Sequence, residues 1–348
     1  MIRFDDIIGQ RTVIKSLQNS ICNNRVSHAY IFEGPEGIGK KTIGRSFAAA
    51  LVCSKEQEAT SKQGNGCKVC SSCMQMVHHN HPDVKIIDAA SEEGKIGSIG
   101  VDDIRQLQKD IYIKPYQSTK KVYIIVGAEK MTIQAQNSLL KILEEPPRYG
   151  VLILTTQHRQ QLLPTILSRA VCIKFRVHPK HEIEQFLYRE YPHMKDKVPI
   201  VTAFSGGIIG RAIQLVNSEE FNSLRNQTLT EAVKLFSRRK WEVLESVQFF
   251  SENKIEVQQI LDIIVTWVRD ILLIKEQCDE KYIINIDKKD TMQQFAHRIK
   301  TNSLMSIIEI MIDTKYKIKR NVNYTLAIET MLIKSWEEIN GKSSRSAV

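Results

Sequence analysis

The chain has 348 residues, of which 42% are hydrophobic and 25% charged, and its net charge is +10. This composition is that of an ordinary globular protein with room for two or three domains. The N-terminal sequence MIRFDDIIGQ lacks a signal-peptide pattern and no apolar run reaches membrane-spanning length, so we expect a cytoplasmic protein with no membrane partner. Residues 1–177 carry most of the basic excess, with 24 basic and 16 acidic residues. The excess is compatible with nucleotide, nucleic acid or an acidic partner and does not choose among them, since a solvated basic surface would look the same.

The first functional pattern is a glycine-rich loop between a buried strand and a helix. Residues 29–32 are apolar enough for a strand, and residues 40–51 have helical spacing. Three glycines between them let backbone N–H groups face an anion: Gly34, Gly37 and Gly39. Lys40 stands where a lysine reaches the outer phosphates, so the pattern predicts a phosphate-binding loop for ATP or ADP.

This loop departs from the ATPase pattern at its next residue. Lys41 stands where a serine or threonine would bind Mg²⁺, and Thr42 follows one place late. A glycine-rich turn that only packs against the sheet is the alternative interpretation. The sequence does not decide whether nucleotide occupies the loop.

Three of the seven cysteines form a regularly spaced group: Cys67, Cys70 and Cys73. Short turns at this spacing aim several thiolates at one tetrahedral ion, and in a reducing cytosol they indicate zinc rather than disulfides. The fourth ligand is open at this point, and three nearby histidines compete with a further cysteine for that place: His78, His79 and His81. A set of free thiols is the plainer alternative. The polar residues 54–66 would be an exposed excursion that the metal holds in place.

Strands and helices alternate up to residue 177. Apolar runs predict further strands at 83–89, 121–126, 151–155 and 172–177. Helices are expected between them, at 101–113, 137–145 and 162–167. This alternation predicts a parallel sheet with right-handed crossovers, and hence an α/β domain. Ligands of such sheets gather at the carboxyl ends of the strands, which here carry Gly127–Glu129, Thr155–Gln157 and the loop before Arg169.

From residue 178 onward, helices replace strands. Helical spacing at 179–188, 198–204 and 210–216 predicts a small helical lid. Residues 218–338 then read as amphipathic helices without a chemical motif, with long apolar faces at 255–274 and 303–316.

Residues 121–176 closely resemble the AAA+ subunits of DNA polymerase clamp loaders. Three blocks carry the resemblance, in order and in spacing: NSLLKILEEPP, the TT pair after the fourth strand, and LLPTILSR. The resemblance covers most of the chain and is strongest over 25–176. It implies an α/β AAA+ P-loop domain with a zinc module at 1–177 and a helical lid at 178–217. It also implies an all-α oligomerisation domain at 218–338, and we expect a disordered tail at 339–348.

The resemblance also shows which catalytic residues are missing. In this family the third strand ends in an acidic pair that holds Mg²⁺ and polarises water, but Val126 and Gly127 stand there. Glu129 remains nearby and is better explained as a solvated or helix-capping charge than as a base. With Lys41, three independent losses converge on the same metal and water, so productive phosphoryl transfer is not expected from this chain.

Other family positions are retained. By the resemblance, Cys53 completes the zinc site, and Thr156 senses the γ-phosphate, although an ordinary strand threonine would look the same. Arg211, after the turn SGGIIG, is similar to the family's second sensor and would point to the nucleotide cleft. Arg169 in LLPTILSR is the counterpart of the arginine finger, which acts in trans on a neighbour's ATP. A plain surface arginine is the alternative for Arg169.

The resemblance implies a structural and regulatory member of a clamp-loader ring. Its partners would be an ATPase subunit of the gamma/tau type and the clamp-opening delta subunit, with the sliding clamp and primed DNA engaged through the complex. A motor ATPase of the gamma/tau type with an unconventional Mg²⁺ site is the alternative, and the three losses argue against it. A stand-alone zinc module that grips DNA would leave the sheet motifs unexplained.

Overall fold

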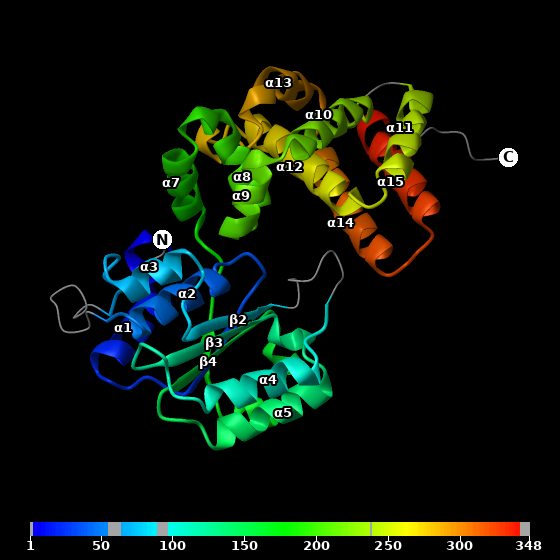
Figure 1. The fold of residues 1–348 in the computed structure, drawn as a ribbon. Helices are drawn as coiled ribbons and strands as arrows, with labels where there is room; N and C mark the ends of the chain where they lie inside the picture. Colours follow the sequence, from blue (N-terminus) through cyan, green and yellow to red (C-terminus); the bar gives the residue numbers. More distant parts are fainter. Residues whose placement is uncertain (1–2, 55–63, 89–96, 237–238, 342–348) are drawn as a thin grey trace. The chain divides into compact units, whose positions relative to one another are not determined.

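A five-stranded parallel sheet forms the centre of the N-terminal part of the chain (Figure 1). The computed structural model describes residues 3–54, 64–88, 97–236 and 239–341. The strand order is β2-β3-β4-β1-β5, with bounds β1 Ala29–Glu33, β2 Val84–Asp88, β3 Lys121–Val126, β4 Gly150–Thr156 and β5 Val171–Lys174. All neighbouring strands run parallel. The predicted α/β class is therefore confirmed, and no end of a predicted strand is displaced by more than three residues.

Alternating side chains of the strands enter two cores on opposite faces of the sheet. Tyr30 and Phe32 of β1 pack on one face with α1 (Arg11–Cys22) and α2 (Lys40–Leu51). Ala29 and Ile31 pack on the other face with α4 (Val101–Ile111) and α5 (Ile133–Glu144). Figure 1 shows these helix pairs on the two sides of the sheet. Because side chains of β1 are buried on both faces of the sheet, the position of this strand is fixed, and so is the start of the glycine-rich loop that follows it.

The chain forms two compact units. One holds residues 1–190 and 205–213, and the other holds 191–204 and 214–348. The first unit also contains these helices: η1 Phe4–Asp6, α3 Ser71–Val77, η3 Ala128–Lys130, η4 Arg159–Gln161, α6 Pro164–Leu167 and α7 Lys180–Glu190. The residues predicted as a lid, 178–217, thus contribute segments to both units, and α9 (Ile209–Asn217) runs from one into the other.

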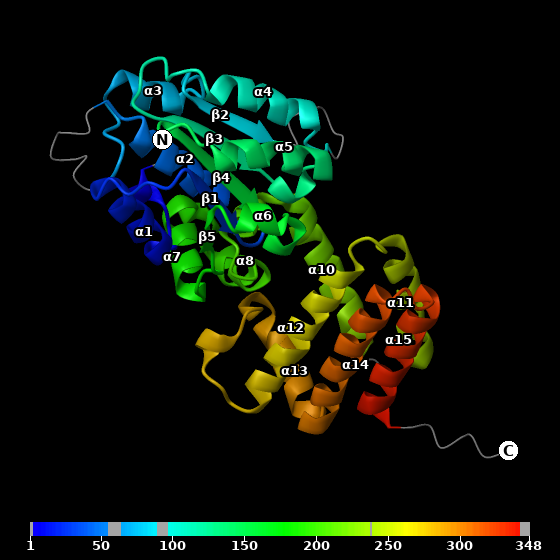
Figure 2. The same cartoon turned by 90° about the horizontal axis from the view of Figure 1, so that it is seen from below.

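Every regular element described in the second unit is helical, as the sequence predicted. Its helices are η5 Pro192–Lys197, α8 Val198–Phe204, α10 Glu219–Lys234, α11 Lys240–Glu252, α12 Val257–Lys275, η6 Glu280–Tyr282, η7 Ile286–Lys288, α13 Lys289–Arg298, α14 Thr301–Lys319 and α15 Tyr324–Asn340. Helix α12 runs through the middle of them and packs against α10, α13 and α14 (Figure 2). Its Trp267 is buried against the rings of Phe236 and Phe295, at centroid distances of 5.2 and 5.7 Å.

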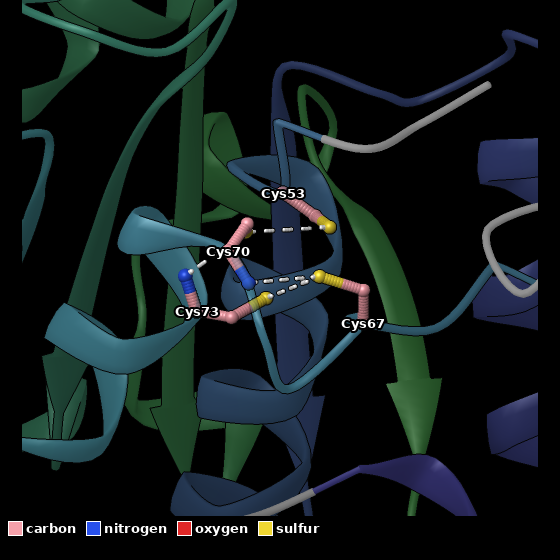
Figure 3. Close-up of side chains that lie close together, drawn as sticks. All are labelled: Cys53, Cys67, Cys70 and Cys73. Carbon is pink, nitrogen blue, oxygen red and sulfur yellow. Dashed lines mark hydrogen bonds between the residues drawn. The ribbon is translucent and has the colours of Figure 1, made fainter. Parts of the chain in front are cut away.

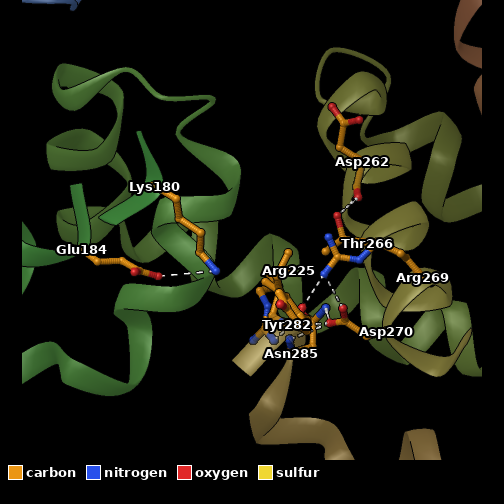
Figure 4. Close-up of polar contacts among 10 residues, drawn as sticks. Lys180, Glu184, Arg225, Asp262, Thr266, Arg269, Asp270, Tyr282 and Asn285 are labelled. Carbon is orange, nitrogen blue, oxygen red and sulfur yellow. Dashed lines mark hydrogen bonds and ion pairs between the residues drawn. The ribbon is translucent and has the colours of Figure 1, made fainter. Parts of the chain in front are cut away.

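A polar network is buried in this unit beside α12 (Figure 4). Asp270 is fully buried, and one of its carboxylate oxygens accepts hydrogen bonds from the backbone N–H groups of Ile284 and Asn285 at 3.0 and 2.7 Å. Arg225 of α10 donates to Asn285 at 2.8 Å and pairs with Asp287 at 2.7 Å. A buried carboxylate is costly without such donors. The network therefore fixes the loop that carries η6 and η7 against α10 and α12.

The predictions for the C-terminal tail and for residues 54–66 fall partly outside the described residues. Helix α15 continues to Asn340, two residues into the predicted tail, while residues 342–348 lie outside the described residues. The predicted polar excursion 54–66 is described only in part, because 55–63 are outside the description, as are 89–96 after β2. Among the described residues, no helix combines the length and the hydropathy needed to cross a bilayer.

Candidate metal centre and phosphate-binding cleft

Four cysteine side chains converge beside the C-terminal end of α2 (Figure 3). Their sulfur atoms all lie within 4.8 Å of one another: Cys53, Cys67, Cys70 and Cys73. Cys53 follows α2 directly, Cys70 caps the N-terminus of α3, and Cys73 lies in the first turn of that helix. The Sγ–Sγ distance is 3.9 Å both for Cys53–Cys70 and for Cys67–Cys73. Tetrahedral zinc–thiolate sites have sulfur–sulfur edges of about 3.8 Å, so the four thiols fit a metal ion of that kind.

Two of the three competing histidines, His79 and His81, have other partners. His81 is buried, and its Nδ1 accepts a hydrogen bond from the backbone N–H of Asp83 at 3.1 Å, while its Nε2 lies 3.2 Å from Gln117 Nε2. Burial lowers the pKa of His81, which keeps the ring neutral. His79 Nε2 lies 3.2 Å from Arg45 Nη2. The structure therefore brings Cys53, and none of these histidines, to the other three cysteines.

Without a metal, the cluster would be a buried group of thiols. Cys53, Cys70 and Cys73 are buried, and Cys67 is partly buried. The hydrogen bond with Cys53, together with burial, raises the pKa of Cys73 well above its ordinary value. Without the ion, α3, of seven residues, would be held by the packing of the thiols and of Met76, which lies in the core with α1 and α2. A bound ion would add to that support by fixing three points of the loop and helix at once.

The cysteine loop also holds the N-terminal segment. Asn65 is buried and its amide donates to both carboxylate oxygens of Asp5 at 3.2 Å. Lys68, next to Cys67, pairs with Asp6 at 2.9 Å. The segment that contains η1 is thus attached to the loop that the cysteines organise.

The glycine-rich loop has the backbone of a phosphate-binding loop. It leaves β1, passes Gly37 and Gly39 with φ of +76° and +102°, and enters α2 at Lys40. These left-handed conformations favour glycine. Lys40 Nζ folds back onto the loop and donates to the carbonyls of Gly34 and Pro35 at 2.5 and 2.8 Å. Burial lowers the pKa of Lys40, and the nearby carboxylates of Glu129 and Glu36 oppose that shift.

Lys41, which stands where the ATPase pattern has a magnesium-binding hydroxyl, forms an ion pair within the chain. Lys41 Nζ lies 2.7 Å from Asp88 Oδ2. Asp88 ends β2 and is in register with Val126 at the end of β3, where the family's first acidic residue is expected. Thr42 is one residue further along α2 and half-buried. An ammonium group therefore stands where a hydroxyl ligand is required, and the residues present do not fit the Mg²⁺ ion of a working ATPase.

The residues at the ends of β3 and β4 bind one another. Thr155 Oγ1 accepts a hydrogen bond from Gly127 N at 3.1 Å, and Thr156, fully buried, accepts from His158 N at 3.2 Å. Glu129 Oε1 accepts from the backbone N–H of Gln157 at 3.3 Å, so this carboxylate holds a loop, as a structural charge would. The sequence placed Gln157 at the carboxyl end of β4 but assigned it no role; its side chain also donates to Glu36 at 3.2 Å and so connects this strand with the phosphate-binding loop.

The start of α9 lies directly on the phosphate-binding loop. The backbone N–H of Gly210 donates to the carbonyl of Gly37 at 2.9 Å. A Cβ atom on Gly210 would lie 2.7 Å from that same oxygen, so only glycine fits here. Arg211 is the next residue and is exposed. The predicted second sensor is therefore placed beside the loop, in the same compact unit.

Arg169 lies at the amino-terminal ends of the strands, away from the phosphate-binding loop, which follows their carboxyl-terminal ends. It precedes β5, whose first residue Val171 pairs with Tyr30, near the start of β1. The phosphate-binding loop leaves β1 at its opposite end, beyond the pair of Glu33 and Lys174. Three residue steps of a parallel strand separate the two pairs, about 10 Å. The sequence grouped the loop before Arg169 with the carboxyl ends of the strands, whereas Arg169 itself lies at their amino ends.

Arg169 is held by neighbours within the chain. Its Nη2 pairs with Glu144 Oε1 at 3.1 Å, and its Nη1 donates to the carbonyl of Thr165 at 3.1 Å and to Ser168 Oγ at 3.3 Å. The side chain remains 36% exposed. The guanidinium is thus oriented by its own surroundings and is still accessible to a further anion.

Two family models match the chain. The model described as "DNA polymerase III, delta subunit" matches residues 9–179, and "DNA polymerase III, delta subunit, C terminal" matches residues 219–338. The chain is 30% identical over 338 residues to DNA polymerase III subunit delta' of Bacillus subtilis, covering 93% of this chain and 95% of that protein. It is 27% identical over 365 residues to subunit tau of the same organism, covering 95% of this chain and 61% of tau. Among solved structures, a DNA polymerase III gamma-subunit-related protein from Thermotoga maritima is 22% identical, covers 93% of this chain and 99% of its own, and has a TM-score of 0.36.

Proposed function

Because the chain belongs to the DNA polymerase III delta-subunit family of clamp-loader proteins, we propose that it acts as the delta' subunit of a clamp loader. In this role it joins a cytoplasmic ring with ATPase subunits of the gamma/tau type and a clamp-opening delta subunit. The ring loads the sliding clamp on primed DNA. Residues 1–177 serve as the AAA+ domain, 178–217 as the lid and 218–338 as the domain that assembles the ring.

Within the ring, the chain works without hydrolysing ATP itself. Lys41 is paired with Asp88, and Val126 and Gly127 offer no carboxylate, so neither Mg²⁺ nor an attacking water would be held. The left-handed loop glycines support a phosphate-binding role, and Lys40 would exchange its bonds to the loop carbonyls for a phosphate, so ATP or ADP would serve as a bound ligand without turnover. The cysteine cluster holds one structural zinc, because four thiolates leave no open position for water.

The observation that carries the proposal is the position of Arg169. The chain's own phosphate-binding loop lies at the carboxyl-terminal ends of the strands, whereas Arg169 lies at their amino-terminal ends. An arginine there can act on a neighbour's nucleotide but is badly placed for its own. A guanidinium at the γ-phosphate would donate hydrogen bonds and offset the charge that builds up in the transition state. Arginine fingers in GTPases contribute about 10³–10⁵ in rate, and we expect less here because other subunits keep their own.

The test is reconstitution of the ring with wild-type chain, without the chain, and with Arg169→Ala. Omission should abolish clamp loading. Arg169→Ala should assemble normally and keep its metal content, while DNA-stimulated ATP hydrolysis and clamp loading fall. Wild-type activity in the Arg169→Ala ring would refute the trans-acting arginine, and full loading without the chain would refute the role in the ring.

A further inference from the structure

Helix α5 supports the segment that carries Arg169 at both of its ends. Near the start of the helix, the buried Gln136 accepts a hydrogen bond from the backbone N–H of Leu163 at 2.9 Å, just before α6. At the end of the helix, Glu144 pairs with Arg169 just after α6. The short helix between these two points is therefore held on α5 from both sides.

Glu144 is unfavourably placed for the helix that contains it. It is the last residue of α5, where the partial negative charge of the helix end disfavours a carboxylate. Glu145 follows as the C-cap and adds a second negative charge. A residue that breaks a local preference in this way often has a compensating role elsewhere. For Glu144, the ion pair with Arg169 is such a role.

The position of Glu144 is fixed by the turn that follows. Pro146 and Pro147 end the helix, and the backbone N–H of Gly150 donates to the carbonyl of Pro147 at 2.8 Å, which leads the chain straight into β4. The carboxylate therefore stands on a backbone that is held between a helix and a buried strand. Glu144 therefore offers the long side chain of Arg169 an ion-pair partner on a well-held backbone.

The contacts leave one side of the guanidinium available. Nη1 donates to Thr165 and Ser168, and Nη2 pairs with Glu144. Nε, the third nitrogen of the guanidinium, carries one N–H donor, and it bonds to none of these three residues. With the side chain 36% exposed, the Nε side is the one that a further anion can reach.

We infer that Glu144 is a positioning residue that orients the Arg169 guanidinium so that its Nε side faces a phosphate of the neighbouring subunit. This inference rests on the proposed function of Arg169. Orientation in advance lowers the entropy lost when the phosphate is bound in the transition state. Both side chains are partly exposed, 36% for Arg169 and 53% for Glu144, so the contribution is limited by solvent screening.

The experiment compares rings reconstituted with wild type, Arg169→Ala, Glu144→Ala, Glu144→Gln, Glu145→Ala and the double variant Arg169→Ala/Glu144→Ala. The measured quantities are kcat and KM for DNA-stimulated ATP hydrolysis, with ring assembly and metal content checked for each. Glu145→Ala is the matched control, since it removes a carboxylate from the same helix end but not the partner of Arg169.

We expect Glu144→Ala to lower kcat about two- to fivefold with KM unchanged, the scale of one exposed ion pair. Glu144→Gln, which keeps an acceptor, should recover part of the loss, and Glu145→Ala should match wild type. The double variant should equal Arg169→Ala, because Glu144 acts only through that arginine. A wild-type kcat in Glu144→Ala alongside a reduced kcat in Arg169→Ala would overturn this inference alone. A double variant whose kcat falls by the product of the two single-variant reductions would also overturn it. A wild-type kcat in Arg169→Ala would overturn the proposed function as well.

Discussion

Replacing Cys70 by serine should remove the metal that we propose for the cysteine cluster. Cys70 is one of four sulfur ligands and also the N-cap of α3, so it connects the ion to the helix. Apparent binding free energies of structural zinc sites are about 10–16 kcal/mol, comparable to the total stability of about 5–15 kcal/mol of a whole domain. Wild-type protein should therefore retain about one zinc per chain through purification under reducing conditions.

The distances in the cluster set the expected spectrum. Two of the six sulfur–sulfur distances are 3.9 Å and the others are at most 4.8 Å. A regular tetrahedron with edges of 3.9 Å has its centre about 2.4 Å from each corner, close to the zinc–sulfur bond length of about 2.3 Å, so metal binding would draw the longer pairs together. X-ray absorption should thus show four sulfur ligands in one shell. A histidine in place of Cys53 would instead add a nitrogen ligand at about 2.0–2.1 Å.

The assay combines elemental analysis with hydrogen exchange. Cys70→Ser should lose most of its zinc and exchange faster over 64–77, because α3 is too short to persist alone. Residues 3–10 should also exchange faster, since Asp5 and Asp6 are held by the cysteine loop. Cys278→Ser removes an exposed cysteine outside the cluster and should match wild type. No metal in freshly purified wild type, or unchanged zinc in Cys70→Ser, would refute the metal site.

Two further outcomes follow from the phosphate-binding cleft and from the sheet. The isolated chain should not hydrolyse ATP, because Lys41 pairs with Asp88 and no carboxylate ends β3; steady-state hydrolysis that disappears in Lys40→Ala would identify a motor subunit instead. Burial would raise the pKa of Asp110, but hydrogen bonds from Tyr123, Lys85 and Lys121 outweigh it and lower the pKa to about 2. The stability contributed by this carboxylate is then complete above its ordinary pKa of 3.8 and is lost as the pH falls towards 2. The gap in urea midpoint between wild type and Asp110→Asn should therefore narrow over that range, and a gap that stays constant would contradict the assignment.

Local patterns in the sequence were enough to predict the strands, but not helix α3 or the first turn of α5. Short runs of apolar residues bounded by turn-forming residues predicted all five strands that the structure describes. The glycines before Lys40 and the spacing of Cys67, Cys70 and Cys73 predicted their sites for the same reason: every residue involved lies within a few positions of the next. The lost magnesium ligands were also visible, because each is a single residue at a known offset from a strand.

Pairings between distant segments were decided only by the tertiary structure. Strand β1 lies between β4 and β5, although these two strands follow it by more than a hundred residues in the chain. The parallel pairing of β1 with β5 places Arg169 at the amino-terminal ends of the strands and the phosphate-binding loop at their carboxyl-terminal ends. The ion pairs Lys41–Asp88 and Arg169–Glu144 join residues on different elements, for which no periodicity gives a signal. Spacing alone left the fourth cysteine ligand open, and the family resemblance named Cys53; in the structure, Cys53 reaches the other three cysteines through the packing of α3 beside the end of α2. Sequence spacing reports which side chains can share a face, whereas the crossovers of a parallel sheet determine which faces meet.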